Sequence, residues 1–318
     1  MRRRLIIGIA LALAFGCGQP QKKAPKAPAT RDFPMAEIPM MITQPDRRAE
    51  WLAQHFWDTF TQPEKLYRCD SVTVNGVPAE KLEQQVGLFA SILQQISIPA
   101  GQEAMKAAFG RLEAFQTAQP EGNTFSQTSA LISRYFYDPN SPVRSEDLYL
   151  PYVSLLAASD LVSEEERRQY AWDARVCALN QTGTPAADFS FVDTEGRRRT
   201  LYGIKAVYTL LVFGNPDCKA CREIMEQMAA SPEISALISS GRLKVVDVYI
   251  DEDVDQWKAN KDTYPKEWIN GYDAGYAIRT DRLYAVRALP SLYLLDEKKN
   301  VLMKDALPEQ VLAVLPSL

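Results

Sequence analysis

Apolar residues in the first half of the chain recur at helical spacing. The two longest series are Leu82, Val86, Phe89, Leu93 and Ile96, and then Met105, Phe109, Leu112 and Phe115. One-sided apolar stripes with this spacing predict amphipathic helices. Pro45 and Asp46 are expected to open an earlier helix that carries Leu52, Phe56 and Phe60. The first half of the chain is therefore predicted to be helical.

Helix-capping and helix-breaking residues between these stripes indicate that the helices are separate. Ser163 and Glu166 have the spacing of a capping box, which predicts the start of a helix that runs through Cys177. The prolines in residues 139–142 separate two further helices. We expect residues 45–179 to form a mainly α-helical domain.

From residue 180 onward the pattern becomes that of strands. Residues 188–193 alternate polar and apolar positions as a half-buried strand does, and the turn at Gly196 leads to a hairpin partner at 199–202. Further strands are expected at 208–213, 243–250, 291–295 and 301–304, and a short helix at 308–315. Strands that alternate with helices predict an α/β sandwich over residues 180–318.

The chain begins like an exported protein. Eleven apolar residues, 5–15, follow a basic start; a bilayer span needs about 20, so the run fits a signal peptide better. It ends in Ala14-Phe15-Gly16-Cys17, which resembles the lipobox of bacterial lipoproteins. That resemblance implies removal of residues 1–16 and a lipid on Cys17. An ordinary signal peptide with a chance cysteine is the alternative.

Residues 17–44 are predicted to follow as a flexible tether. Pro20, Pro25 and Pro28 lie among glutamine, lysine and alanine, so this stretch has little to bury. A lipid and a tether would hold the folded part at a membrane, facing the periplasm. Cysteines there meet an oxidising compartment.

Composition narrows the function. The chain has 318 residues, 46% of them hydrophobic and 24% charged, as in ordinary globular proteins. Removal of Arg2, Arg3 and Arg4 from the 36 basic residues leaves 33 against 40 acidic ones. We therefore expect no nucleic-acid partner, since that needs a dense basic face. The single histidine, His55, excludes multi-histidine metal sites and is expected to be structural.

The chemistry of the chain centres on Cys218-Lys219-Ala220-Cys221, which lies between a predicted strand and a predicted helix. The first thiol would sit at a helix N-terminus, where unpaired N–H groups favour the thiolate. Thiolate is the form that attacks disulfides. Cys221 is one turn further on, close enough to form a disulfide with Cys218 and release the substrate. The motif predicts a redox-active pair.

Two other roles are compatible with a Cys-x-x-Cys motif. A zinc site needs a second pair of ligands, but Cys69 and Cys177 are 108 residues apart and His55 is isolated, so we expect no metal. A purely structural disulfide between Cys218 and Cys221 is the second alternative. Cys69 and Cys177 are expected to be free thiols, although they could instead pair with each other.

Residues 185–318 resemble the thioredoxin-fold thiol–disulfide oxidoreductases of the TlpA/ResA type. The resemblance rests on residues 187–189, the hairpin at Gly196, the paired cysteines and the stretch 288–296. It implies a thioredoxin-like sandwich with Pro290 as its cis-proline. It also implies that the backbone of Leu289 contacts an extended substrate peptide. The helical half resembles an uncharacterised domain that precedes such modules in envelope lipoproteins, which implies an arrangement and no activity.

The sequence departs from that family where a buried acid would be expected. Val212 occupies the place of thioredoxin's buried aspartate, and Ile224 that of a frequent glutamate in the TlpA/ResA type. The group that accepts the proton of Cys221 is therefore left open, with Glu223 and Asp217 as candidates.

Together these patterns predict a periplasmic, lipid-anchored thiol–disulfide oxidoreductase that uses no cofactor. Its expected partners are disulfide-containing envelope proteins, a membrane electron donor and the membrane itself. Cys218 would attack and Cys221 would resolve, with net reduction of the substrate. The alternative is a non-catalytic binding or scaffold lipoprotein whose helical domain holds a ligand or partner.

Overall fold

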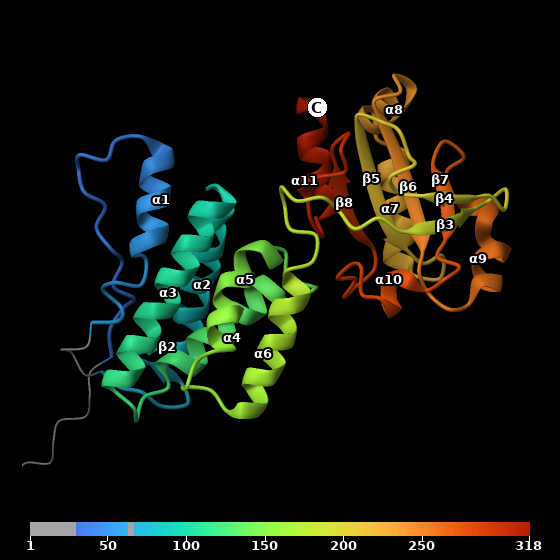
Figure 1. Ribbon diagram of the computed structural model, residues 1–318. Coiled ribbons are helices and arrows are strands. Elements are labelled where there is room, and N and C mark those ends of the chain that lie inside the picture. Colours follow the sequence, from blue (N-terminus) through green and yellow to red (C-terminus); the bar gives the residue numbers. More distant parts are fainter. Residues whose placement is uncertain (1–29, 63–66) are drawn as a thin grey trace, which may run out of the picture.

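Helices fill one part of the molecule and a mixed sheet the other, and the two lie side by side (Figure 1). The computed structural model describes residues 30–62 and 67–318. The predicted signal peptide, Cys17 and the predicted tether as far as residue 29 lie outside the described residues. No helix in the described ranges is both long and apolar enough to cross a membrane.

The helical part contains the predicted apolar stripes. Its helices are α1 (Pro45–His55), α2 (Ala79–Leu93), α3 (Ile98–Ala118), α4 (Thr124–Tyr137), α5 (Glu146–Leu156) and α6 (Glu164–Cys177). The stripe residues of α2 and α3 are buried, all but Phe115 in one core, although Ile96 lies beyond the end of α2. The capping box at Ser163 and Glu166 is confirmed. A small hairpin of β1 (Thr73–Val74) and β2 (Val77–Pro78) was not predicted.

Two residues assigned to the first predicted helix lie outside it. Helix α1 ends at His55, so Phe56 and Phe60 occupy the turns that follow, where both are fully buried. A continued helix would direct Phe56 and Trp57 about 100° apart. Instead, both rings pack on Phe33 in one aromatic cluster. The prediction was wrong for these two residues because apolar residues at helical spacing also occur in the turns that follow α1.

The second part is a seven-stranded sheet in the order β4-β3-β7-β6-β5-β8-β9. The strands are β3 (Ser190–Asp193), β4 (Arg198–Thr200), β5 (Tyr208–Gly214), β6 (Leu243–Tyr249), β7 (Ile269–Tyr272), β8 (Ser291–Leu295) and β9 (Val301–Met303). Strand β6 runs parallel to both β5 and β7, whereas β8 is antiparallel to β5.

Helices cover both faces of this sheet. They are α7 (Lys219–Ala229), α8 (Pro232–Ser239), α9 (Val254–Asn260), α10 (Ala277–Thr280) and α11 (Pro308–Val314). Side chains of α7, α8 and α11 pack with Leu210, Val212 and Val245 on one face. Leu211 and Phe213 point to the other face, which Ile278 of α10 helps to cover. The predicted α/β sandwich preceded by a helical domain is thus confirmed.

Strand β7 was missed by the sequence analysis. It is only four residues long, and Asn270 and Gly271 interrupt its apolar pattern. A Cβ at Gly271 would lie 2.6 Å from the Phe191 ring and from the carbonyl oxygen of Val192. Glycine is therefore needed for the close pairing of β7 with β3, and close pairing of this kind is not visible in hydrophobic periodicity.

Candidate active site

Cys218 and Cys221 lie where strand β5 passes into helix α7, as the sequence predicts. Cys218 is the N-cap residue of α7, and the backbone N–H of Cys221 donates to its Sγ at 3.2 Å. Cys218 is partly exposed, whereas Cys221 is only 7% exposed; both are free thiols. The arrangement offers one thiol to a partner and keeps the other inside the fold.

The segment that leads into β8 passes beside these thiols. The Leu289–Pro290 peptide bond is cis. The Cys218 thiol donates a long hydrogen bond, 3.8 Å, to the carbonyl oxygen of Leu289. Pro290 lines the same small cavity as Cys221. The structure therefore brings together the four residues that the sequence analysis assigned to the site.

A buried carboxyl that the sequence analysis missed lies on the same cavity. Asp247 is on β6, 3% exposed, and is paired in register with Val212 of β5. The cavity has a volume of about 10 Å³, and its lining includes Cys221, Asp247 and Tyr264. A Cβ on Gly214 would lie 3.5 Å from both carboxylate oxygens. A buried acid thus lies on the strand next to Val212.

Burial sets the protonation of both groups on this cavity. It raises the pKa of the Asp247 carboxyl to about 7. Burial, assisted by a hydrogen bond with Cys218, raises the pKa of the Cys221 thiol to about 12. Within the described part of the chain, Asp247 Oδ1 and the Tyr264 hydroxyl have no hydrogen-bond partner. A carboxyl that can exchange a proton near neutral pH therefore faces a thiol that must lose one before it reacts.

The two acids suggested by sequence do not face this cavity. Glu223 is exposed and pairs with Lys219 at 3.4 Å. The Asp217 carboxylate is exposed and accepts a hydrogen bond from the amide of Gln256. Neither acid lines the cavity beside Cys221, and Glu223 partly neutralises Lys219, the first residue of α7.

The remaining candidate residues lie away from the paired thiols. His55 Nδ1 is 2.7 Å from Asp58 Oδ2, and its ring stacks on Trp51, as expected for a structural histidine. Cys69 and Cys177 are free thiols in the helical part, and Cys177 is fully buried. Over residues 30–62 and 67–318, no group of three or more histidine, cysteine or acidic side chains is arranged to hold a metal ion.

The sheet order, the flanking helices and the paired thiols place this protein among the thioredoxin-like proteins. It is 33% identical to a thioredoxin-like protein from Bacteroides caccae ATCC 43185, whose crystal structure matches with a TM-score of 0.78 over 91% of this chain and 99% of that one. Because the match extends over nearly all of both chains, the relative has the helical part as well as the sheet.

Residues 16–178 match a family described as a domain of unknown function, DUF5106, and the chain belongs to this family. The C-terminal domain of an uncharacterized protein from Bacteroides fragilis NCTC 9343 is 44% identical, with a TM-score of 0.42 over 43% of this chain and 98% of that one. A domain of a possible thiol-disulfide isomerase from Cytophaga hutchinsonii ATCC 33406 is 25% identical, with a TM-score of 0.39 over 44% and 94%. No curated protein sequence matches.

Proposed function

We propose that this protein is a thiol–disulfide oxidoreductase. One observation carries the proposal: a partly exposed Cys218 at the start of α7 lies 3.2 Å from the Cys221 backbone nitrogen and 3.8 Å from the Leu289 carbonyl oxygen. The helix N-terminus stabilises negative charge on the first thiol. The Leu289 backbone lies where an extended substrate could pair with it.

In the proposed reaction the Cys218 thiolate attacks one sulfur of a substrate disulfide. That disulfide breaks, a mixed disulfide forms, and the departing substrate sulfur takes a proton. Cys221 then loses its proton and attacks Sγ of Cys218, which forms the Cys218–Cys221 disulfide and releases the second substrate thiol. The substrate gains two electrons and the cysteine pair loses them.

Asp247 is the proposed proton acceptor for Cys221. A thiol with a pKa of about 12 is almost fully protonated at neutral pH, so its attack requires a base. Asp247 lines the same cavity, and its pKa of about 7 suits proton exchange. The cavity, about 10 Å³, is at the lower limit for a single water molecule, which could relay the proton.

We further propose that the protein acts at the cell envelope as a reductase. The apolar run that ends at Cys17 supports export and a lipid anchor on the periplasmic side of a membrane. In that oxidising compartment the pair would reduce disulfides of envelope proteins and be re-reduced by a membrane electron donor.

The test is turnover of a disulfide-containing peptide with dithiothreitol as the electron source. Wild-type protein should catalyse the reduction and Cys218→Ser should abolish it. Pre-reduced Cys221→Ser, mixed with the peptide disulfide after removal of dithiothreitol, should retain a mixed disulfide on Cys218, because the resolving thiol is absent. Cys69→Ser is the control and should behave as wild type. A wild-type protein without turnover would favour the alternative, a non-catalytic scaffold.

A further inference from the structure

The segment that carries Leu289 to the active site has little regular structure of its own. Residues 281–290 connect α10 to β8 without a helix or strand, and Arg282 has a positive φ of 53°. On the side of the sheet part, Tyr284 is buried and its hydroxyl donates to the carbonyl of Ala187 at 2.6 Å. Its two arginines, Arg282 and Arg287, instead contact the helical part.

The helical part and the connector after it hold the segment at three successive places. The Arg282 guanidinium lies 4.1 Å from the ring centroid of Trp172 on α6. The Asn180 side chain donates to the carbonyl of Leu283 at 2.7 Å. Arg287 Nε lies 2.7 Å from Glu146 Oε1, at the start of α5. Two of these contacts are made by arginines that reach out of the thioredoxin-like part.

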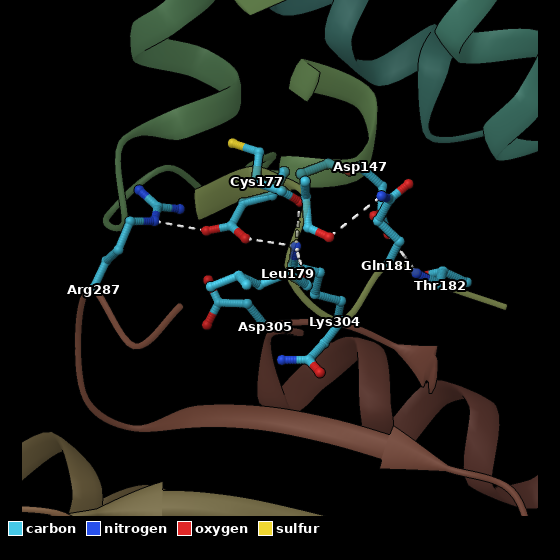
Figure 2. Close-up of polar contacts among 12 residues, drawn as sticks. Asp147, Cys177, Leu179, Gln181, Thr182, Arg287, Lys304 and Asp305 are labelled. Carbon is cyan, nitrogen blue, oxygen red and sulfur yellow. Dashed lines mark hydrogen bonds and ion pairs between the residues drawn. The ribbon is translucent and has the colours of Figure 1, made fainter. Parts of the chain in front are cut away.

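Glu146 also contacts the chain beyond β8. Figure 2 labels the two cations that this carboxylate binds, Arg287 and Lys304. The second oxygen of Glu146, Oε2, is 2.9 Å from Lys304 Nζ, at the end of β9. The neighbouring Asp305 accepts from Arg144 of the helical part at 3.0 Å and from Ser291, the first residue of β8, at 2.7 Å. The helical part thus contacts the polypeptide both before Leu289 and after Pro290.

These contacts are shielded from water. The side chains of Glu146 and Lys304 are each 2% exposed and that of Arg287 is 16% exposed. One carboxylate between two cations is well compensated, whereas removal of its charge would leave both cations buried with less compensation. Such a contact holds its geometry more tightly than an exposed ion pair, which solvent and salt weaken.

We propose that the helical part is a positioning element for residues 281–291, and that through them it determines how well a peptide disulfide is accepted at Cys218. The proposal rests on the oxidoreductase function proposed above. It gives the helical domain a task in the reaction although none of its side chains touches the reacting sulfurs. Glu146 is then a positioning residue, which acts through Arg287 and the backbone of Leu289.

Glu146→Gln tests this proposal, because it keeps the size of the side chain and removes the charge. The pre-reduced protein is mixed with a peptide disulfide or with hydroxyethyl disulfide, which is too small to pair with the Leu289 backbone. We expect the rate constant for the peptide to fall about tenfold, since small misplacements of binding groups have effects of this size. The rate constant for hydroxyethyl disulfide should stay within about twofold of wild type.

Asp147→Asn is the matched control. Asp147 is the next residue, is also buried, and binds Thr182 of the connector at 2.7 Å instead of the 281–291 segment. It should leave both rates at the wild-type value. Should Glu146→Gln fail to fold, Trp172→Ala removes the partly exposed contact with Arg282 and should lower only the peptide rate.

Equal rates for variant and wild type with the peptide would overturn the positioning role. An equal fall with both disulfides would overturn it too, because the thiols themselves would then be affected. A wild-type protein that reduces neither disulfide would instead refute the oxidoreductase function, so the two failures are distinguishable.

Discussion

The buried carboxyl of Asp247 should make the reduced protein less stable as the pH rises. An aspartate in an unfolded chain has a pKa of about 3.9, whereas burial raises the pKa of Asp247 to about 7. Between these values the folded state holds a proton that the unfolded state has released. Stability therefore falls over this range, since the unfolded state binds fewer protons. With about 1.4 kcal/mol per pKa unit, three units give about 4 kcal/mol.

Asp247→Asn removes this dependence while it preserves the shape of the side chain. Guanidinium unfolding of the reduced proteins, followed by the fluorescence of the buried Trp257 and Trp268, measures the free energy of unfolding. Near pH 4 ionisation of Asp247 should change the free energy of unfolding of the wild type by less than about 1 kcal/mol relative to the variant. Between pH 4 and pH 8 the free energy of unfolding of the variant should rise by about 3 to 4 kcal/mol relative to that of the wild type.

Asp193→Asn is a control with the opposite sign. Asp193 is buried, but hydrogen bonds from Arg199 and Arg197 outweigh that burial and lower its pKa to about 2. Its stabilising effect is present above the unfolded pKa of about 3.9 and is lost as the pH falls toward about 2. This variant should be less stable than wild type at neutral pH. A stability difference for Asp247→Asn that does not change with pH would refute the reasoning, because the carboxyl would then ionise as it does in water.

Three further measurements address the cysteines. A fatty-acid probe should label the wild type and not Cys17→Ser in cells; an unlabelled wild-type protein would exclude the lipid anchor. Iodoacetamide should modify Cys218 before Cys221, because Cys221 is buried and burial raises its pKa to about 12; peptide mapping would contradict this if Cys221 reacted first. After oxidation of that pair, the denatured lipidated protein should titrate with two free thiols, Cys69 and Cys177; no free thiol would mean that these two are paired.

Local patterns were enough to locate the paired thiols. Cys218 and Cys221 are contiguous in sequence, and their place between a strand and a helix follows from hydrophobic periodicity. Leu289, whose carbonyl contacts Cys218, is 71 residues further along the chain, and Pro290 follows it. Both were found through the family resemblance. Periodicity alone does not bring such distant segments together.

Asp247 was missed because its position near Cys221 depends on the register between strands β5 and β6. In the sequence it is one of two charged residues, with Lys244, in a strand whose other residues are apolar or aromatic. Both faces of the strand are buried, and Leu243 and Val245, which share the parity of Asp247, pack against the helices of one face. A buried acid without a visible cation is costly and points to function. Its pairing with Val212, and so its approach to Cys221, becomes visible only in the sheet.

The contacts between the two parts were also beyond the sequence analysis. Glu146 and Arg287 are 141 residues apart, and in sequence each resembles an ordinary surface charge. Charged residues are rarely buried unless they are paired, and the sequence contains no sign of which partner each one finds. The role proposed for the helical part depends on such pairs.

An equilibrium redox titration of the Cys218–Cys221 pair against thiol buffers tests the central claim most directly. The helix N-terminus stabilises the Cys218 thiolate, which makes the pair easier to reduce, whereas Asp217 places an opposing negative charge next in sequence. We predict a reversible two-electron transition between about −270 and −180 mV, in the range where a donor-supplied reductase operates. A potential near −120 mV, about the value of a strong oxidant, would contradict the reductase assignment. A pair that forms no reversible disulfide at any potential would contradict the oxidoreductase function itself.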